Sequence, residues 1–236
     1  MPNHVKNRLE ILGTKEQVKE VVNAFNTHHP AALNRAYDGK IICRDKNTDK
    51  FSVGWFDEKT GMFSRRDMDD VLGLPDGWEF EIEKAFDHFP NFEKVMPQPE
   101  NIFRGDLGQK EEEMCGREGR PTWLDWNIAN WGTKWNSYSC EKIDDNIYTF
   151  ETAWSGVPTL MEALSKQHPN VEFIYEYSDE DTGYNTGIYK LKNGIISEQH
   201  PENGSKEAYD LAFKLRPHYK EDYVLIDGNW EYKDED

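Results

Sequence analysis

The order of the expected elements in the C-terminal half constrains the fold more than any other feature of the sequence. Segments 135–143 and 147–154 read as two strands joined by an Asp-Asp-Asn turn, and segments 171–177 and 184–191 read as a second pair around an acidic turn. A helix that begins near Pro158, a residue favoured in a first helical turn, separates the pairs. Helices between antiparallel strand pairs are typical of α+β proteins.

The N-terminal segment adds a strand that leads directly into a helix. Residues 5–12 read as the strand, and Thr14 with Gln17 three positions later forms a capping box in front of an apolar helical stripe. A split β-α-β arrangement accounts for the order of all these elements. We therefore expect an α+β protein with a ferredoxin-like antiparallel sheet, helices packed on one face, and an inserted elaboration.

We expect one domain over residues 1–236, with the elaboration at about 36–87 and a C-terminal extension at about 195–236. In the extension, Ser205 caps a helix and residues 223–232 form a short hairpin. Residues 89–96 are predicted to be extended, and the polar, glycine-bearing stretch 104–120 is predicted to be a loop. A helix capped by Thr122 then runs to Trp131 and is closed by Gly132.

Composition excludes several classes of protein. No apolar run approaches the 18 or so residues that cross a bilayer, and the N-terminus lacks the pattern of a signal peptide, so we expect a cytoplasmic protein. The net charge of −17 repels nucleic-acid phosphates and attracts basic partners. The three cysteines are far apart, and the sequence contains none of the common catalytic, nucleotide-binding or metal-binding motifs. We assign no catalytic residue, metal ligand or cofactor.

The densest cluster of candidate binding residues is the tryptophan-rich segment 123–135, which holds four of the eight tryptophans. Exposed aromatic side chains of this kind stack bases, sugars or partner side chains. The alternative is a tryptophan-rich core, whose indole N–H groups would bond to Asn127 and Asn130. Asp125 is explained by its position behind the Thr122 cap. The candidate residues of this region are Trp126, Asn130, Trp131, Lys134, Trp135 and the more distant Trp154.

The acidic turn at Asp179, Glu180 and Asp181 is a second candidate for partner contact. The spacing of an EF-hand fails here, because the sixth and twelfth positions counted from Asp179 are Tyr184 and Lys190 instead of a glycine and a carboxylate. We expect an exposed acidic turn between two strands.

Several strings of this sequence match a pattern found in known proteins. The most specific string is Asn-Trp-Gly-Thr-Lys-Trp at 130–135. Softer matches are Met-Pro-Asn at 1–3, Pro-Gln-Pro-Glu at 97–100, Thr-Ala-Trp-Ser at 152–155 and the acidic hairpin at 175–187. Together these strings resemble the YubB-like family of plasmid, phage and genomic-island proteins, and the resemblance covers roughly residues 1–26 and 88–190. It implies a ferredoxin-like C-terminal portion and an origin on a mobile element, and it supplies no catalytic positions.

Our first hypothesis is a non-enzymatic accessory protein of a phage or plasmid that binds a host or defence protein with a basic surface, with nucleic-acid mimicry as one form of this binding. The alternative is a nucleotide- or small-ligand-binding protein or enzyme, whose pocket would use the tryptophans while Lys134 faces an anion. Single-stranded nucleic-acid binding would need a basic patch, and the sequence offers only scattered cations, so direct nucleic-acid binding is not expected.

Overall fold

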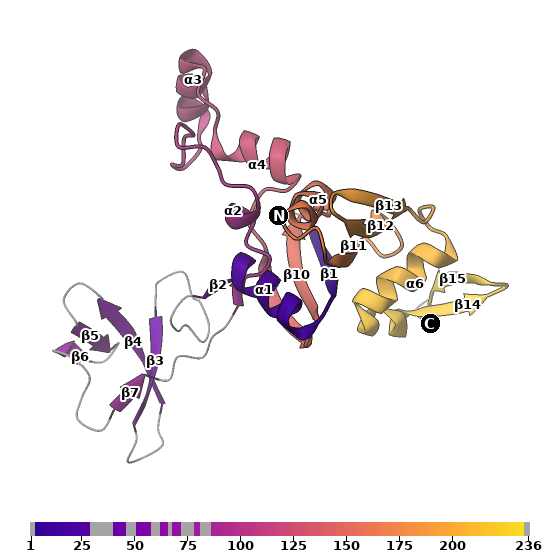
Figure 1. Ribbon diagram of the computed structural model, residues 1–236, viewed down its shortest axis with the longest axis horizontal. Coiled ribbons are helices and arrows are strands. Elements are labelled where there is room, and N and C mark those ends of the chain that lie inside the picture. The colour runs from indigo at the N-terminus through magenta and orange to yellow at the C-terminus, as the bar shows by residue number, and fades with distance from the viewer. Residues whose placement is uncertain are drawn as a thin grey trace. The chain divides into compact units, whose positions relative to one another are not determined.

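The computed structural model describes residues 3–28, 40–45, 51–57, 62–65, 68–71, 78–80 and 86–233, with side chains for residues 3–26 and 88–233. The chain divides into two compact units, one formed by Met1–Asn26 with His88–Asp236 and the other by Thr27–Asp87 (Figure 1). The single domain expected over residues 1–236 stays a prediction, and the side chains of its elaboration at about 36–87 lie outside the described residues.

The first unit is a ferredoxin-like α+β fold, as the element order predicted. The six elements that make up the ferredoxin-like core of this unit are, in chain order, β1 (His4–Leu12), α1 (Lys15–Phe25), β9 (Tyr138–Asp144), β10 (Ile147–Ala153), α5 (Pro158–Gln167) and β11 (Glu172–Asp179). The sheet order β11-β1-β10-β9 is antiparallel throughout and gives the split β-α-β arrangement. Strands β12 (Thr186–Lys192) and β13 (Ile195–Gln199) continue this sheet beyond β11.

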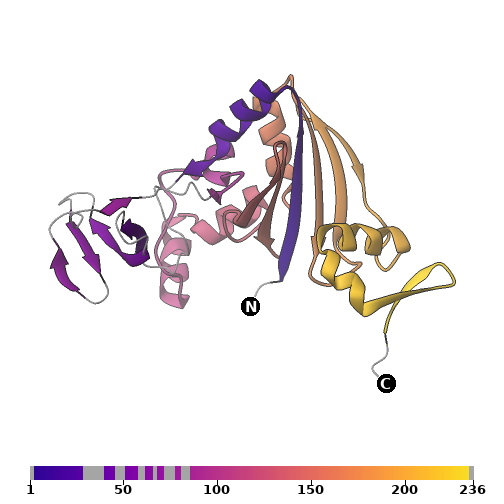
Figure 2. The same cartoon turned by 90° about the horizontal axis from the view of Figure 1, so that it is seen from below.

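Alternation along the strands sends apolar side chains to one face of this sheet, where α1 and α5 cover them. Leu9, Phe150, Phe173 and Tyr175 are completely buried there. α6 (Lys206–Leu215), capped by Ser205, covers part of the opposite face, and Figure 2 shows it across the sheet from α1. The prediction of helices on one face therefore holds for the ferredoxin-like elements, and the C-terminal extension departs from it.

Short-range signals set most of the element ends. The capping box of α1 is formed, with Gln17 N donating to the Thr14 hydroxyl and Thr14 N donating to the Gln17 side chain. After α6, the 3₁₀ helix η1 (Pro217–Asp222) leads into the predicted hairpin of β14 (Tyr223–Ile226) and β15 (Asn229–Tyr232).

Three further helices lie between α1 and β9 in the first unit: α2 (Phe92–Val95), α3 (Gln109–Glu118) and α4 (Trp123–Trp131). α4 begins after Thr122 and ends at left-handed Gly132, as predicted. The extended segment predicted at 89–96 is wrong in its second half, which is α2. The loop predicted at 104–120 is wrong from Gln109 onward, where α3 packs Cys115 inward.

The second unit holds a five-stranded antiparallel sheet of order β6-β5-β4-β3-β7. Its strands are β3 (Lys40–Asp45), β4 (Phe51–Asp57), β5 (Met62–Arg65), β6 (Met68–Val71) and β7 (Trp78–Phe80). Short strands β2 (Thr27–His28) and β8 (Phe86–His88) pair with each other. Among the residues that the structure describes, no helix has the length and apolar character needed to cross a membrane.

Candidate binding surface

Three segments meet at one end of the ferredoxin-like sheet, and the carboxylate of Asp179 joins them. Asn3, which precedes β1, donates from its side chain to Asp179 Oδ1 at 3.2 Å. Asn185, which precedes β12, donates from Nδ2 to Asp179 Oδ2 at 2.8 Å. The same amide lies 3.3 Å from the carbonyl oxygen of Trp154, whose own N–H donates to the Asn3 carbonyl. Asp179 is therefore a buried connector at the end of β11, with 4% of its surface exposed.

A second set of hydrogen bonds fixes the loop after α4 to the end of β10. The Thr133 hydroxyl donates to the carbonyl of Ala153 at 2.7 Å and accepts from the Ala153 N–H at 3.1 Å. The Ser155 hydroxyl donates to the carbonyl of Gly132. Because Thr133 is completely buried, this connection is shielded from water and holds residues 133–135 beside Trp154.

The backbone of Trp154 takes a conformation that large side chains rarely adopt. Its φ of 76° lies in the left-handed region, where a Cβ atom meets the following carbonyl. The hydrogen bonds of Trp154 N to Asn3 and of Asn185 to the Trp154 carbonyl hold this conformation. The result is an indole that points outward from the end of a strand.

Lys134, Trp135 and Trp154 form what we call the aromatic surface. The Lys134 ammonium lies 4.7 Å from the centroid of the Trp135 ring and 5.6 Å from that of the Trp154 ring. Both distances are within the range of a cation–π interaction. The two indoles nevertheless remain 38% and 43% exposed. No carboxylate among the described residues forms an ion pair with Lys134.

Tyr138, which packs against Trp135, and His4, which hydrogen-bonds to Tyr138, support the aromatic surface. Tyr138 meets Trp135 edge to face at 6.3 Å between centroids, and its hydroxyl lies 2.7 Å from His4 Nδ1. Burial raises the pKa of Tyr138 strongly, and the nearby carboxylates of Glu151 and Glu180 raise it further. The phenol therefore keeps its proton at neutral pH and acts as a fixed hydrogen-bonding group.

The structure separates the tryptophans of segment 123–135 into two groups. Trp131 is 2% exposed, packs against Phe92 and donates from its indole to the Met96 carbonyl. Trp126 meets Trp131 edge to face at 5.6 Å, and Asn130 donates to the Trp126 carbonyl. These three candidate residues belong to α4, whereas Lys134 lies against both the Trp135 and the Trp154 rings. The expectation that indole N–H groups bond to Asn127 and Asn130 is wrong for Trp123 and Trp131, whose indoles donate to the carbonyls of Gly105 and Met96. The Asn127 Oδ1 atom accepts from Gln98 instead.

The acidic turn at residues 179–181 also separates into buried and exposed residues. Glu180 and Asp181 are exposed, as expected, whereas Asp179 is interior and accepts hydrogen bonds from Asn3, Asn185 and the N–H of Asp181. No group of three His, Cys, Asp or Glu side chains in the described ranges is placed to hold a metal ion.

The residues that sequence reasoning missed are those that fasten the surface to the fold: Asn3, His4, Thr133, Tyr138 and Asn185. Asn185 has φ of 45°, a conformation that asparagine tolerates better than most residues, and its place in a turn before a strand is the one available signal. The others make contacts across long sequence separations, for which the sequence has no local signal.

Comparison with models of protein families supports the fold assignment. Residues 131–234, somewhat less than half of the chain, match the family described as "Ferredoxin-like domain in Api92-like protein". A crystal structure of a protein api92 from Yersinia pseudotuberculosis is similar over 86% of this chain and 99% of that chain, with 13% identity and a TM-score of 0.41. No curated protein matches this sequence.

Proposed function

We propose that this protein is a non-enzymatic accessory protein that acts by binding a partner protein with a basic surface, and that the aromatic surface is its contact site. The observation that carries the proposal is the exposure of Trp135 and Trp154 on a backbone held by buried hydrogen bonds. Large aromatic side chains on a rigid support are typical anchors of protein interfaces.

Charge supports a basic partner. The net charge of −17 attracts and steers a cationic protein, and the exposed carboxylates of Glu180 and Asp181 follow directly after the Asp179 connector. The resemblance to YubB-like proteins of mobile elements makes a host or defence protein the partner that we propose, in the bacterial cytoplasm. Mimicry of nucleic acid is the form of binding that such a charge favours.

A photo-crosslinking amino acid tests this proposal. It replaces Trp135 in one variant and Ile195, which is 74% exposed on β13, in a control variant. We expect a covalent adduct with a basic protein in the bacterial host from position 135 only, reduced by salt and by the charge-removing substitutions Glu180→Gln and Asp181→Asn. Equal adducts from both positions, or adducts that are insensitive to salt and to these substitutions, would contradict the proposal.

One observation favours a second candidate, a small anionic ligand. Lys134 lies against both indoles without a carboxylate partner among the described residues, so a planar anion such as a nucleotide could stack there. Titration with a nucleotide panel, followed by tryptophan fluorescence, decides between the candidates. Quenching that Trp135→Phe removes and Trp123→Phe retains supports the ligand, and an unchanged spectrum excludes it.

A further inference from the structure

A cleft of about 430 Å³ lies on the face of the sheet that carries α6. Its walls come from the C-terminal end of α6, from the start of η1 at Pro217 and His218, and from β1, β9 and β10. The volume falls within the range of about 300–1,000 Å³ that is usual for small-molecule sites. The cleft belongs entirely to the first unit, and the residues of the aromatic surface are not among its lining residues.

The lining of the cleft is cationic, although the chain as a whole is strongly acidic. It has four permanent cations and two carboxylates, a net charge of +2, where the whole chain carries −17. The cations are Lys6, Arg8, Lys214 and Arg216, and the carboxylates are Glu141 and Glu151.

Two of these cations are neutralised inside the protein. Arg8 donates to Glu176 at 2.9 Å, and Lys214 donates to both oxygens of the same carboxylate at 2.6 and 2.7 Å. Arg8 also contacts Glu10 at 2.7 Å. Arg8 and Lys214 therefore brace α6 against the sheet. The other two cations of the lining, Lys6 and Arg216, share the cleft with the carboxylates of Glu141 and Glu151.

Neither Arg216 nor Lys6 forms an ion pair among the residues that the structure describes, although Lys6 lies directly opposite Glu151 on β10. Arg216 is only 7% exposed, and its guanidinium donates to the carbonyl oxygens of His4, Ser178 and Asp179 at 2.7, 2.8 and 3.1 Å. These bonds use three of the five N–H groups of the guanidinium and place no carboxylate at ion-pair distance from it, which is costly for a buried ion. An anion in the cleft would supply the missing charge.

Thr149 gives an independent indication of a ligand. It lies on β10 directly opposite Arg8, lines the cleft and is 8% exposed. Its hydroxyl is buried and has no hydrogen-bond partner within the described part of the chain. Most buried polar groups are hydrogen-bonded, so an unused hydroxyl in the wall of a cationic cleft points to a ligand that accepts or donates there.

We propose that this cleft binds a single organic anion, a carboxylate or phosphate monoester attached to an apolar body. Lys6 and Thr149 contact the anionic group, and the buried Arg216 contributes positive charge next to it. The apolar body contacts Ile143, Ile147 and Leu215. Glu141 and Glu151 repel a polyanion, and the strands that line the cleft offer no aromatic ring for base stacking of the kind that sheet-based RNA-binding domains use. The site is distinct from the aromatic surface.

Calorimetric titration of the full chain with phenyl phosphate and with benzoate tests the inference. We expect saturable one-site binding of at least one of them, and weaker binding of inorganic phosphate, benzyl alcohol and benzylamine. Lys6→Gln should weaken binding about tenfold, because it removes a charged hydrogen-bond donor. Thr149→Val should weaken it several-fold while keeping the size of the side chain.

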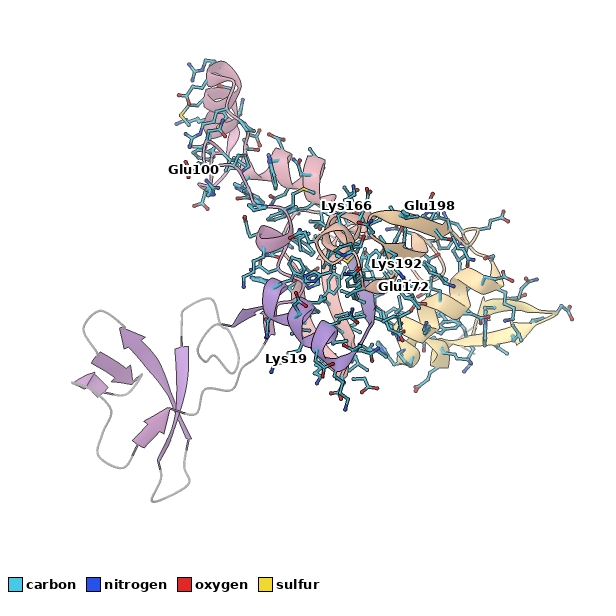
Figure 3. All side chains as sticks on the ribbon, viewed as in Figure 1. Lys19, Glu100, Lys166, Glu172, Lys192 and Glu198 are labelled. Carbon is cyan, nitrogen blue, oxygen red and sulfur yellow. The ribbon has the colours of Figure 1, made fainter. Side chains whose placement is uncertain are left out.

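Lys19→Gln is the matched control, since it removes the same charge from the exposed side of α1 (Figure 3). It should leave the affinity unchanged. The inference is overturned if neither organic anion saturates, if benzyl alcohol binds as tightly, or if Lys19→Gln weakens binding as much as Lys6→Gln. Circular dichroism of each variant establishes that the fold is retained, and amide chemical shifts place the bound probe at β1 and β10 or elsewhere.

Discussion

At the scale of single residues, Trp154 combines exposure with an unfavourable backbone conformation. A bulky residue with φ of 76° costs stability that a glycine would not. Its indole is 43% exposed, so packing offsets little of this cost. Strained residues of this kind concentrate at functional sites, which agrees with a role for Trp154 in contact with a partner.

We expect Trp154→Gly to be more stable than Trp154→Ala, by about 1 kcal/mol, because glycine removes the steric conflict and alanine keeps it. Urea unfolding of the two variants measures the difference. At the exposed Tyr232 in β15, where φ is not positive, the order should reverse and alanine should be the more stable replacement. Greater stability of alanine at both positions would show that Trp154 is not strained.

At the scale of elements, α6 is attached to the sheet through a buried carboxylate. Glu176 is 4% exposed on β11 and accepts from Arg8 of β1 and Lys214 of α6. The three side chains therefore connect β1, β11 and α6, which are far apart in the sequence. The same attachment places the end of α6 over β1 and so forms one wall of the cationic cleft.

Glu176→Gln should lower the free energy of unfolding by about 1–3 kcal/mol, since two cations lose their shared carboxylate and one of them is largely shielded from water. Denaturant unfolding measures this loss. Glu172→Gln is the matched control, because Glu172 is the first residue of the same strand, lies on the same face and is less buried than Glu176 (Figure 3). Equal losses from both substitutions would mean that the attachment contributes nothing specific.

The elements that the sequence predicted correctly are those with local signals at both ends. α1, α4 and α6 each begin after a Thr or Ser cap, and α4 ends at a left-handed glycine. α3 was missed because its ten residues bury only Cys115 and carry Gly116 inside the helix, so it has no apolar stripe to detect. α2 has four residues, too few for a periodic pattern to show.

At the scale of the whole molecule, a group of buried tyrosines makes the stability of the core sensitive to alkaline pH. Tyr175, Tyr177 and Tyr189 pack against one another with ring centroids 5.8–6.2 Å apart. The hydroxyl of Tyr175 donates to Asn7 and accepts from Val157 N. Burial raises the pKa of all three, because a phenolate loses its hydration inside the core.

The folded state therefore holds these protons after the unfolded chain has released them near pH 10. Because the folded state then binds more protons than the unfolded state, stability should fall as pH rises. For the fully buried Tyr175 alone, the loss is about 1.4 kcal/mol for each pH unit above 10. Urea unfolding between pH 8 and pH 11, with tyrosinate absorbance recorded in parallel, measures it. A flat profile, or tyrosinate formed before unfolding, would contradict this expectation.

The candidate surface was only partly predictable, because it exists only after folding. The sequence singled out Lys134, Trp135 and Trp154 as aromatic or charged residues in unusual strings, and it grouped them with Trp126 and Trp131. The separation of the two groups depends on Thr133 reaching Ala153 and on Asp179 reaching Asn3 and Asn185. The cationic cleft gave no signal, since its cations come from β1 and from the end of α6, which are about two hundred residues apart.

The position of β1 in the sheet has a consequence for biosynthesis. Both neighbours of β1, strands β10 and β11, are made of residues 147–179, while β1 and α1 end by Phe25. At ordinary rates of translation, the two edges of β1 stay unpaired on the order of ten seconds or more, until the strands that bond to them have been made. The high sequence separation of these pairings also slows folding of the finished chain. A nascent chain of this kind depends on chaperones, or on the solubility that its acidic residues give, until its central strand is paired.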